Sequence, residues 1–306
     1  MEKYVAAVIQ DAPVLFDLAK TIEKTADLVH EASSNNARLI LFPEAFIPAY
    51  PRGLSFGTNV GSRNEAGREL WRLYNENSLN LSGKEFSSLS KMAKSANAFL
   101  VIGVIEKEPI SSGTLYCTTL YFGPDGNLLG KHRKLKPTAS ERIIWGEGDG
   151  STLDVFDTSI GKLGGLICWE NYMPLARMAM YQQGVQVYMT PTADQRETWQ
   201  TSMRHIACEG RCYVLSANQY VTKNMYPEHV LALEQLEPES DVLCRGGSVI
   251  VDPMGNVIAG PLFDESGIIY SELSLKAVIA SRMDFDVCGH YSRNDIFELK
   301  INRTGH

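Results

Sequence analysis

The chain has 306 residues, of which 44% are hydrophobic and 21% are charged, a composition typical of globular rather than disordered or fibrous proteins. Its net charge of −7 argues against general binding to the phosphate backbone of nucleic acids. The apolar runs are too short to cross a membrane, and we expect no signal peptide, because an apolar strand begins within the first few residues. Six scattered cysteines fit a reducing compartment better than a disulfide framework. We therefore expect a cytoplasmic protein with a single domain over residues 1–306, and neither nucleic acid nor membrane as a partner.

Apolar periodicity and turn-forming residues predict strands that alternate with helices. In chain order we expect a strand at 5–10, a helix at 17–34, a strand at 38–44, helices at 65–78 and 84–97, a strand at 99–105 and a hairpin at 114–134. There follow a strand at 163–168, a helix at 174–183, a strand at 185–190, a helix at 195–211, a strand at 213–218, a hairpin at 248–259 and a strand at 268–273. A short C-terminal extension after about residue 273 begins with a helix at 274–282. This series predicts an α/β fold with mixed sheets covered by helices, in one sheet or two, and reactive groups beyond the strand ends.

The predicted strand 163–168 ends at a thiol. Gly164 and Gly165 allow close approach of the backbone before Cys168, and Pro174 can occupy the first turn of the following helix. A thiol near a helix N-terminus has a lowered pKa and a larger thiolate fraction. The layout is similar in principle to a nucleophile elbow, although the Gly-x-Ser-x-Gly motif is missing. Cys168 is therefore a candidate nucleophile, and the alternative is an inert buried cysteine.

Two other strand ends carry charged side chains. Glu44 follows the apolar run 39–43, where desolvation would raise the pKa of a carboxylate and suit it to proton transfer near neutrality. Alternation along the strand that ends at Lys134 puts Arg133 and Lys134 on opposite faces, so that one of them can point inward. An inward ammonium could stabilise developing negative charge. The alternatives are a surface ion pair for Glu44 and a solvated basic turn for Lys134.

Other candidate groups have weaker support. Cys208 and Cys212, with His205 nearby, could hold a metal on one helical face, but no second ligand pair follows and small core residues explain the spacing better. His132 could act as the base of a cysteine, yet spacing selects none of the six histidines. Glu141 is unremarkable in isolation. We therefore predict no metal and no organic cofactor.

At these residues the chain resembles the nitrilase branch of the carbon–nitrogen hydrolase family, from the first strand to about residue 299. The resemblance rests on three motifs in the family's order, Phe42-Pro43-Glu44-Ala45-Phe46, His132-Arg133-Lys134-Leu135 and Cys168-Trp169-Glu170-Asn171. It implies that Glu44 is the general base, that Lys134 is an electrostatic stabiliser and that Cys168 is the nucleophile. Glu141 would position the lysine and the substrate. The resemblance also implies a four-layer αββα sandwich whose subunits pair into an αββααββα dimer.

The residues around these motifs favour nitriles as substrates. Cys-Trp-Glu after the strand is typical of nitrilases, and Tyr50-Pro51-Arg52-Gly53 is similar to nitrilases that take aromatic or bulky unsaturated nitriles. We therefore expect conversion of a nitrile to a carboxylic acid and ammonia through a thioimidate and a thioester on Cys168. The alternatives are an amide- or carbamoyl-cleaving hydrolase with the same groups, or a cyanide-degrading relative, against which Asn171 counts because such relatives tend to have His there. We expect the pocket to be lined by Trp169, Tyr50, Thr190 and Trp145, although core packing explains the last two equally well.

Overall fold

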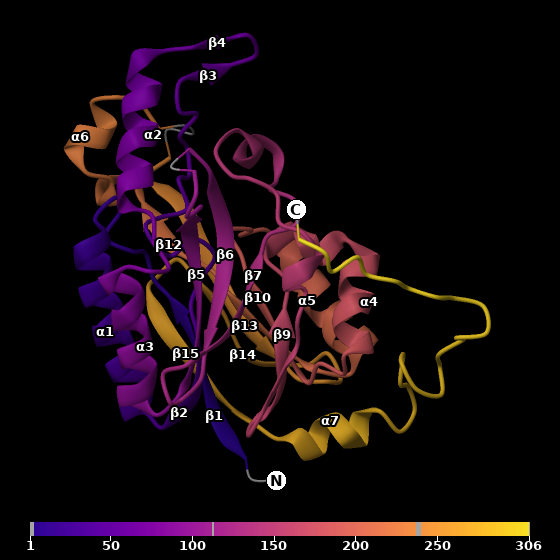
Figure 1. The fold of residues 1–306 in the computed structure, drawn as a ribbon. Coiled ribbons are helices and arrows are strands. Elements are labelled where there is room, and N and C mark those ends of the chain that lie inside the picture. Colours follow the sequence, from indigo (N-terminus) through magenta and orange to yellow (C-terminus); the bar gives the residue numbers. More distant parts are fainter. Residues whose placement is uncertain (1–2, 112, 237–239, 306) are drawn as a thin grey trace.

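The computed structural model describes residues 3–111, 113–236 and 240–305, and two large β-sheets form the middle of the molecule (Figure 1). The first sheet has six strands in the spatial order β15 (Gly267–Leu273), β1 (Tyr4–Gln10), β2 (Ala37–Leu41), β5 (Phe99–Lys107), β6 (Leu115–Phe122) and β7 (Leu128–Arg133). Strands β1, β2 and β5 run parallel, whereas β15, β6 and β7 pair antiparallel with their neighbours. The sheet is therefore mixed, as predicted.

The second sheet has seven strands. Six of them follow the order β12 (Tyr220–Thr222), β13 (Val242–Val251), β11 (Tyr213–Ala217), β10 (Val187–Pro191), β9 (Gly161–Gly165) and β8 (Phe156–Thr158), and β14 (Val257–Phe263) pairs with β13. Strands β9, β10 and β11 are parallel. The short strands β3 (Thr58–Asn59) and β4 (Ser62–Arg63) form a separate hairpin at the top of Figure 1.

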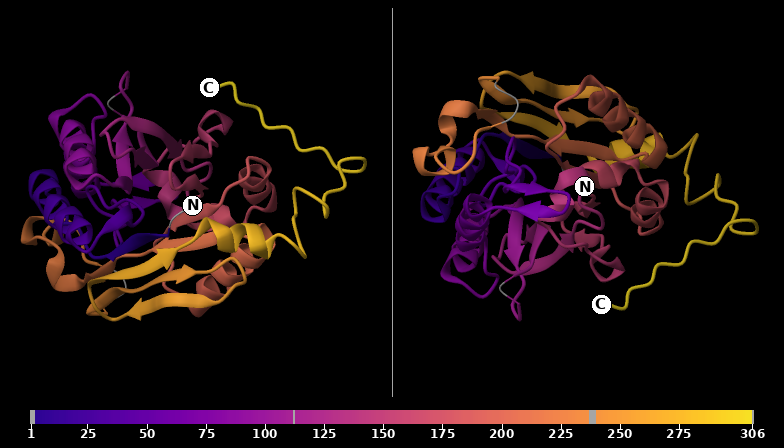
Figure 2. Two further views of the ribbon diagram at one scale, coloured as in Figure 1. Left: turned by 90° about the horizontal axis from the view of Figure 1, so that it is seen from below. Right: turned by 90° about the horizontal axis from the view of Figure 1, so that it is seen from above.

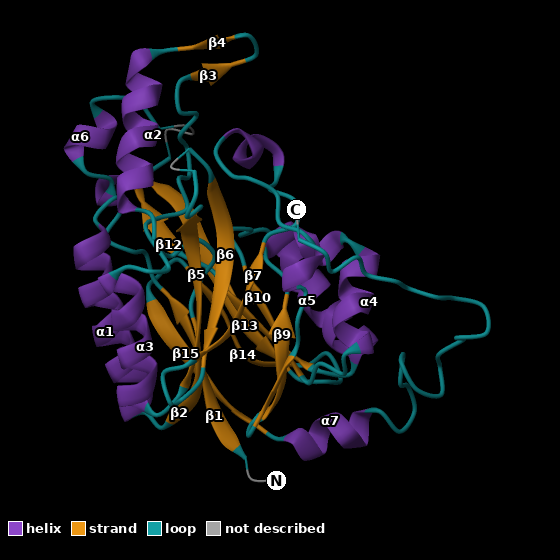
Figure 3. Cartoon of the chain, in the orientation of Figure 1, coloured by secondary structure: helices purple, strands orange, loops and turns teal. Residues whose placement is uncertain are grey.

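The helices cover the outer faces of both sheets (Figure 3). Helices α1 (Leu18–Ser34) and α3 (Lys84–Ala96) pack on the first sheet, and α4 (Pro174–Gln182) and α5 (Glu197–Gly210) pack on the second. Helices α2 (Glu65–Asn77) and α6 (Glu228–Leu231) lie at the end of the sheets nearest the β3–β4 hairpin, and α7 (Leu275–Ser281) follows the last strand. This arrangement is the predicted four-layer αββα sandwich, and the question of one sheet or two is answered.

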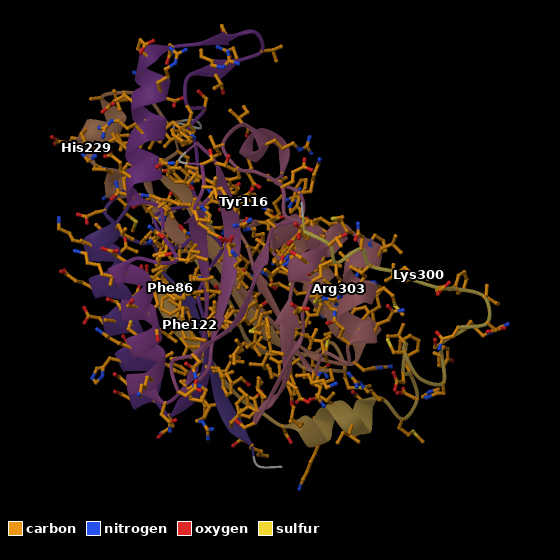
Figure 4. All side chains as sticks on the ribbon, viewed as in Figure 1. Phe86, Tyr116, Phe122, His229, Lys300 and Arg303 are labelled. Carbon is orange, nitrogen blue, oxygen red and sulfur yellow. The ribbon has the colours of Figure 1, made fainter. Side chains whose placement is uncertain are left out.

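Strand β1 illustrates how the sequence builds these layers. Its side chains alternate, so that Ala7 and Ile9 pack toward α1 and α3 while Ala6 and Val8 pack between the two sheets. Both faces are buried, which explains the uninterrupted apolar run at the start of the chain. The aromatic rings of Phe86 on α3 and Phe122 on β6 have centroids 5.4 Å apart and join the helical layer to the first sheet (Figure 4).

Two strands end earlier than predicted. Strand β2 ends three residues before Glu44, and β9 ends three residues before Cys168. Glycine explains how the first loop leaves its sheet: a Cβ at Gly103 of β5 would lie 2.2 Å from the Pro43 carbonyl oxygen, so the chain before Glu44 passes directly over β5. Both residues therefore lie beyond the strand ends, Glu44 in a loop and Cys168 at the start of a 3-10 helix.

The elements that were not predicted are short. Strands β3, β4, β8 and β12 and helix α6 have two to four residues each, too few for a periodic pattern. Strand β13 begins at Val242, six residues before the predicted start, because it continues through Gly246 and Gly247. Both glycines have a positive φ, and the register of β13 with β14 shifts there, so the strand is irregular where the prediction stopped.

Beyond α7 the chain continues as an irregular segment beside the layer formed by α4 and α5 (Figure 2). Val287, Leu299 and Ile301 of this segment are partly buried against that layer. Across the described ranges, no helix has both the length and the apolar character needed to span a bilayer.

Candidate active site

A buried ammonium group, that of Lys134, is surrounded by side chains from distant parts of the chain. Its Nζ lies 2.6 Å from Glu44 Oε1 and 2.7 Å from Glu141 Oε2. Lys134 is fully buried whereas Arg133 forms ion pairs elsewhere, so the prediction that one of the two would point inward is confirmed. Burial alone would lower the pKa of Lys134, but Glu44, Cys168 and Glu141 raise it well above its ordinary value, and the group stays charged. We call Glu44, Lys134, Glu141 and Cys168 the lysine cluster.

Glu141 holds the lysine from one side. It lies in a short 3-10 helix, Ala139–Ile143, that turns its carboxylate back toward the preceding chain. Oε2 accepts hydrogen bonds from Lys134 and from the Thr138 backbone N–H at 2.6 Å, and Oε1 accepts one from the Tyr50 hydroxyl at 2.6 Å. Both oxygens are engaged, which suits this carboxylate to orienting the lysine rather than to accepting a further proton.

Glu44 differs from Glu141 in having an oxygen available. Its Oε1 accepts from Lys134 and lies 3.6 Å from Cys117 Sγ, whereas Oε2 has no hydrogen-bond partner among the described residues. Gln219 holds the backbone of this loop by donating to the Glu44 carbonyl oxygen at 2.9 Å. Burial raises the pKa of Glu44, although Lys134 opposes the shift. Such a carboxylate can take and return protons near neutrality.

Cys168 begins a tight turn, Cys168–Tyr172, and has a φ of 50°, in the left-handed region that residues other than glycine rarely adopt. The Asn171 amide stabilises the turn by donating to the Cys168 carbonyl oxygen at 2.8 Å. The Thr192 hydroxyl donates to the sulfur at 3.2 Å. A Cβ at Gly165 would lie 1.9 Å from a backbone oxygen of β10, so the close approach predicted there does require glycine.

The predicted low pKa of the Cys168 thiol is wrong. Burial and the Glu44 carboxylate raise the pKa to about 12, and Lys134 opposes this only in part. The reason is positional: helix α4 begins six residues further on, so its N-terminus does not stabilise a thiolate. The thiol is therefore protonated near neutrality and needs a base before it can react. Glu44 is the neighbour suited to this, since it interacts with Cys168 and its Oε2 has no hydrogen-bond partner among the described residues.

A cavity of about 240 Å³ opens onto Cys168. Trp169, Tyr50 and Arg52 contribute to its wall, and a larger cavity of about 500 Å³ shares Tyr50 and Arg52 with it. Trp169 is 40% exposed, and its indole N–H donates to Asp194 at 2.8 Å. Trp169 and Tyr50 therefore line the same cavity as the thiol, as predicted, and Arg52 lines it too, although the sequence analysis did not propose this residue for the wall.

The other two expected wall residues lie elsewhere. Trp145 is buried behind Tyr50, with ring centroids 5.7 Å apart. Thr190, on β10, is fully buried, and its hydroxyl lies 3.0 Å from the sulfur of Met203 in α5. Its side chain faces the helical layer, so the prediction that Thr190 lines the pocket is corrected. Strand β10 ends at residue 191, and Thr192, just beyond that end, is the threonine that contacts the thiol.

Glu170 has contacts that no sequence pattern signals. Its Oε1 accepts a hydrogen bond from the Leu135 backbone N–H at 2.6 Å, and its Oε2 accepts one from the Ile167 backbone N–H at 2.7 Å. Leu135 directly follows Lys134, and Ile167 directly precedes Cys168. One buried carboxylate therefore joins the two chain segments that carry the ammonium and the thiol.

His132 completes this arrangement. Its Nε2 lies 3.0 Å from Glu170 Oε2, and its Nδ1 lies 3.1 Å from the Thr152 carbonyl oxygen. Burial alone would lower the pKa of His132, but Glu170 raises it above its ordinary value. His132 is thus held by Glu170 and is not the base of a Cys/His pair. We call these two residues the His132–Glu170 clamp.

The chain belongs to the carbon–nitrogen hydrolase family, whose sequence model matches residues 5–283. It is similar to a nitrilase of Bradyrhizobium diazoefficiens, with 50% identity over 299 residues that cover 98% of this chain and 92% of the relative. It is also similar to an aliphatic nitrilase of Sinorhizobium fredii, with 49% identity over 302 residues that cover 99% of this chain and 96% of the relative. These relatives place the chain in the nitrilase branch, as the three motifs predicted.

The fold agrees with that of solved members of the family. A carbon–nitrogen hydrolase from Helicobacter pylori superimposes with a TM-score of 0.74 at 22% identity, covering 96% of this chain and 97% of the other. At so low an identity the likeness concerns the αββα architecture alone.

Proposed function

We propose that the protein is a nitrilase, which hydrolyses an organic nitrile to a carboxylic acid and ammonia through covalent intermediates on Cys168. The main observation behind this proposal is that Glu44 and Glu141 both bond to Lys134 but differ in their other hydrogen bonds. Glu141 uses both oxygens to hold Tyr50, Thr138 and Lys134, whereas Glu44 keeps Oε2 without a partner among the described residues. A base, a charge stabiliser and a nucleophile are thereby assigned to different groups.

The first half of the reaction forms a thioimidate. Glu44 removes the proton from Cys168, and the sulfur attacks the nitrile carbon while one pair of C≡N π electrons moves to nitrogen. The nitrogen then takes the proton held by Glu44. Lys134 and the backbone N–H of Trp169 stabilise the charge that develops on nitrogen. The high pKa of Cys168 makes this assisted deprotonation necessary, because little free thiolate exists near neutrality.

The second half consumes two waters. Glu44 activates the first water, which adds to the thioimidate carbon, and the tetrahedral intermediate expels ammonia to leave a thioester. A second water hydrolyses the thioester, releasing the acid and restoring the thiol. Expulsion of Cys168 instead of ammonia would release an amide, so an amide by-product is chemically accessible. No step requires a metal or an organic cofactor.

The substituent of the nitrile would occupy the larger cavity next to Tyr50. Its volume of about 500 Å³ and the side chains of Leu54, Phe56 and Ile144 suit an aromatic or bulky unsaturated group. One relative is described as an aliphatic nitrilase, so a substrate panel should compare aliphatic nitriles with aromatic and unsaturated ones.

We also infer that the protein acts in the cytoplasm as a homodimer or a larger homo-oligomer, with residues 1–306 forming one domain. Tyr172, Met173 and Leu175, at the beginning of α4, are 41%, 40% and 68% exposed, and a second copy would cover these apolar side chains. Light scattering coupled to gel filtration would give a mass of at least two subunits. A monomer at micromolar concentration would contradict the inference.

Ammonia release from a panel of nitriles, run beside the matching amides and cyanide, tests the proposed function. We expect aromatic and unsaturated nitriles to give acid and ammonia, and the matching amides to react far more slowly. Faster release from the amides would favour the amide-cleaving alternative, and activity confined to cyanide would favour the cyanide-degrading one. No release from any of them would leave the protein as a non-catalytic member of the family.

A further inference from the structure

The His132–Glu170 clamp takes no part in the proposed chemistry, yet it holds the chain next to two groups that do. The backbone N–H groups of Leu135 and Ile167 both donate to Glu170, at 2.6 Å and 2.7 Å. Because these residues are the immediate neighbours of Lys134 and Cys168, a shift of the carboxylate would move both segments. The clamp is therefore a direct link between the two segments.

The clamp is also completely engaged. Glu170 and His132 are 1% and 3% exposed, and every oxygen and ring nitrogen of the pair has a partner. The Thr152 carbonyl oxygen can only accept, so Nδ1 of His132 donates to it, whereas Nε2 faces the Glu170 carboxylate, which raises the pKa of His132 and favours the charged ring. Two backbone N–H groups and one imidazole ring thus hold the Glu170 carboxylate in a single position.

We propose that Glu170 and His132 are positioning residues that set the placement of the Lys134 ammonium relative to the Cys168 thiol. The proposal rests on the nitrile hydrolysis proposed above, in which Lys134 acts on the nitrogen of a group bonded to Cys168. Misplacement of reacting groups by about 1 Å costs about 10²-fold in rate. Loss of the clamp should therefore reduce turnover while leaving the walls of the cavity, and so substrate binding, nearly intact.

The substitution Glu170→Gln tests the proposal with little change in shape. An amide offers one acceptor oxygen, and its NH₂ group would face an N–H donor of the chain, so one of the two backbone contacts is lost. We expect kcat for a reactive nitrile to fall by about 10²-fold with a much smaller change in KM. Steady-state ammonia release over a range of nitrile concentrations separates the two constants.

His132→Gln should reduce kcat less than Glu170→Gln, because both backbone contacts to the carboxylate remain. If the two residues act as one unit, the double variant will be no slower than Glu170→Gln alone. Additive losses would contradict a joint role for the pair. His132→Gln also keeps the proposal testable if the Glu170 variant does not fold.

Glu106→Gln provides a matched control. Glu106 is also buried and bonds to Lys131, Arg133 and Thr118, and none of its hydrogen bonds within the described ranges reaches the segment that carries Cys168. We expect this variant to lose stability while its kcat falls far less than that of Glu170→Gln. Equal losses of kcat in the two variants would mean that the clamp supports the fold in general and does not specifically position Lys134 and Cys168, which would overturn the proposal.

The alkylation rate of Cys168 by iodoacetamide separates this proposal from the proposed function, since it requires no nitrile. Mass spectrometry of the Cys168 peptide gives the rate. We expect slower alkylation in Glu170→Gln, because a displaced ammonium supports the thiolate less. If the wild-type protein hydrolyses no nitrile, the nitrilase proposal fails while this rate still tests the clamp. Unchanged alkylation in a folded Glu170→Gln protein would refute the clamp alone.

Discussion

The lysine cluster and the His132–Glu170 clamp are two buried charged groups that share two pieces of chain, and they differ in whether their polar atoms all have hydrogen-bond partners. His132 lies two residues before Lys134, and Glu170 lies two residues after Cys168. The cluster borders a cavity, and Glu44 Oε2 has no partner among the described residues. The clamp has a partner for each of its polar side-chain atoms. This difference suits the lysine cluster to proton transfer and the His132–Glu170 clamp to holding the neighbouring chain segments in place.

Removal of the nucleophile should have the largest effect. In Cys168→Ala no thioimidate can form, and we expect ammonia release from a nitrile to fall by at least about 10⁴-fold. Cys117→Ala is the control, because Cys117 is equally buried and lies 3.6 Å from Glu44 Oε1 but does not line the cavity. It should keep most of the activity. Substantial turnover by Cys168→Ala would remove the nucleophile assignment.

Glu44→Gln should follow, with a loss of about 10²–10⁴-fold, because an amide of the same shape cannot accept the thiol proton. Its pH profile is more informative than its rate. Burial raises the pKa of Glu44, and the base must be ionised, so kcat/KM of the wild type should fall as pH decreases through a value above the ordinary 4.5. This acid limb should vanish from the residual activity of the variant. An acid limb at or below pH 4.5 would argue against Glu44 as the base.

The sequence was a good guide where a reactive side chain follows a strand. Glu44 and Cys168 each follow a largely buried strand, and Lys134 directly follows β7, so their position beyond strand ends was predictable once the strands were assigned to two packed sheets. The layers themselves follow from apolar runs such as that of β1, whose two faces are both buried.

The remaining features depend on the path of the loops. Cys168 has a left-handed backbone, and Thr192, just beyond the end of β10, contacts the thiol instead of Thr190; no periodicity encodes either feature. Glu170 escaped prediction because its partners include backbone N–H groups of residues 135 and 167, and every residue except proline has such a group. The thiol pKa was predicted in the wrong direction because burial, which raises it, is not visible in the local sequence.

The smallest expected effect is that of His132 protonation on the free energy of unfolding, and it tests whether the clamp stabilises the fold while the lysine cluster serves the reaction. The groups that face His132 are the Glu170 carboxylate, the Thr152 carbonyl oxygen and, more remotely, Asp154, and together they raise its pKa above 6.5 against the effect of burial. A raised pKa means that the native state holds this proton more tightly than the unfolded chain does. The resulting stabilisation is fully present below pH 6.5 and is lost as pH rises through the folded-state value.

Urea unfolding of the wild type and of His132→Gln at a series of pH values from 5.5 upward would measure this contribution. We expect the difference in the free energy of unfolding between the two proteins to be largest at the acid end and to shrink as pH increases. Parallel curves would mean that folding does not shift the pKa of His132, and a difference that grows with pH would mean that the buried ring is neutral. Either result would contradict an ion pair in the clamp. A shrinking difference would show that protonation of His132 in the clamp stabilises the folded protein. Protonation of Glu44, by contrast, is expected to change the rate of the reaction.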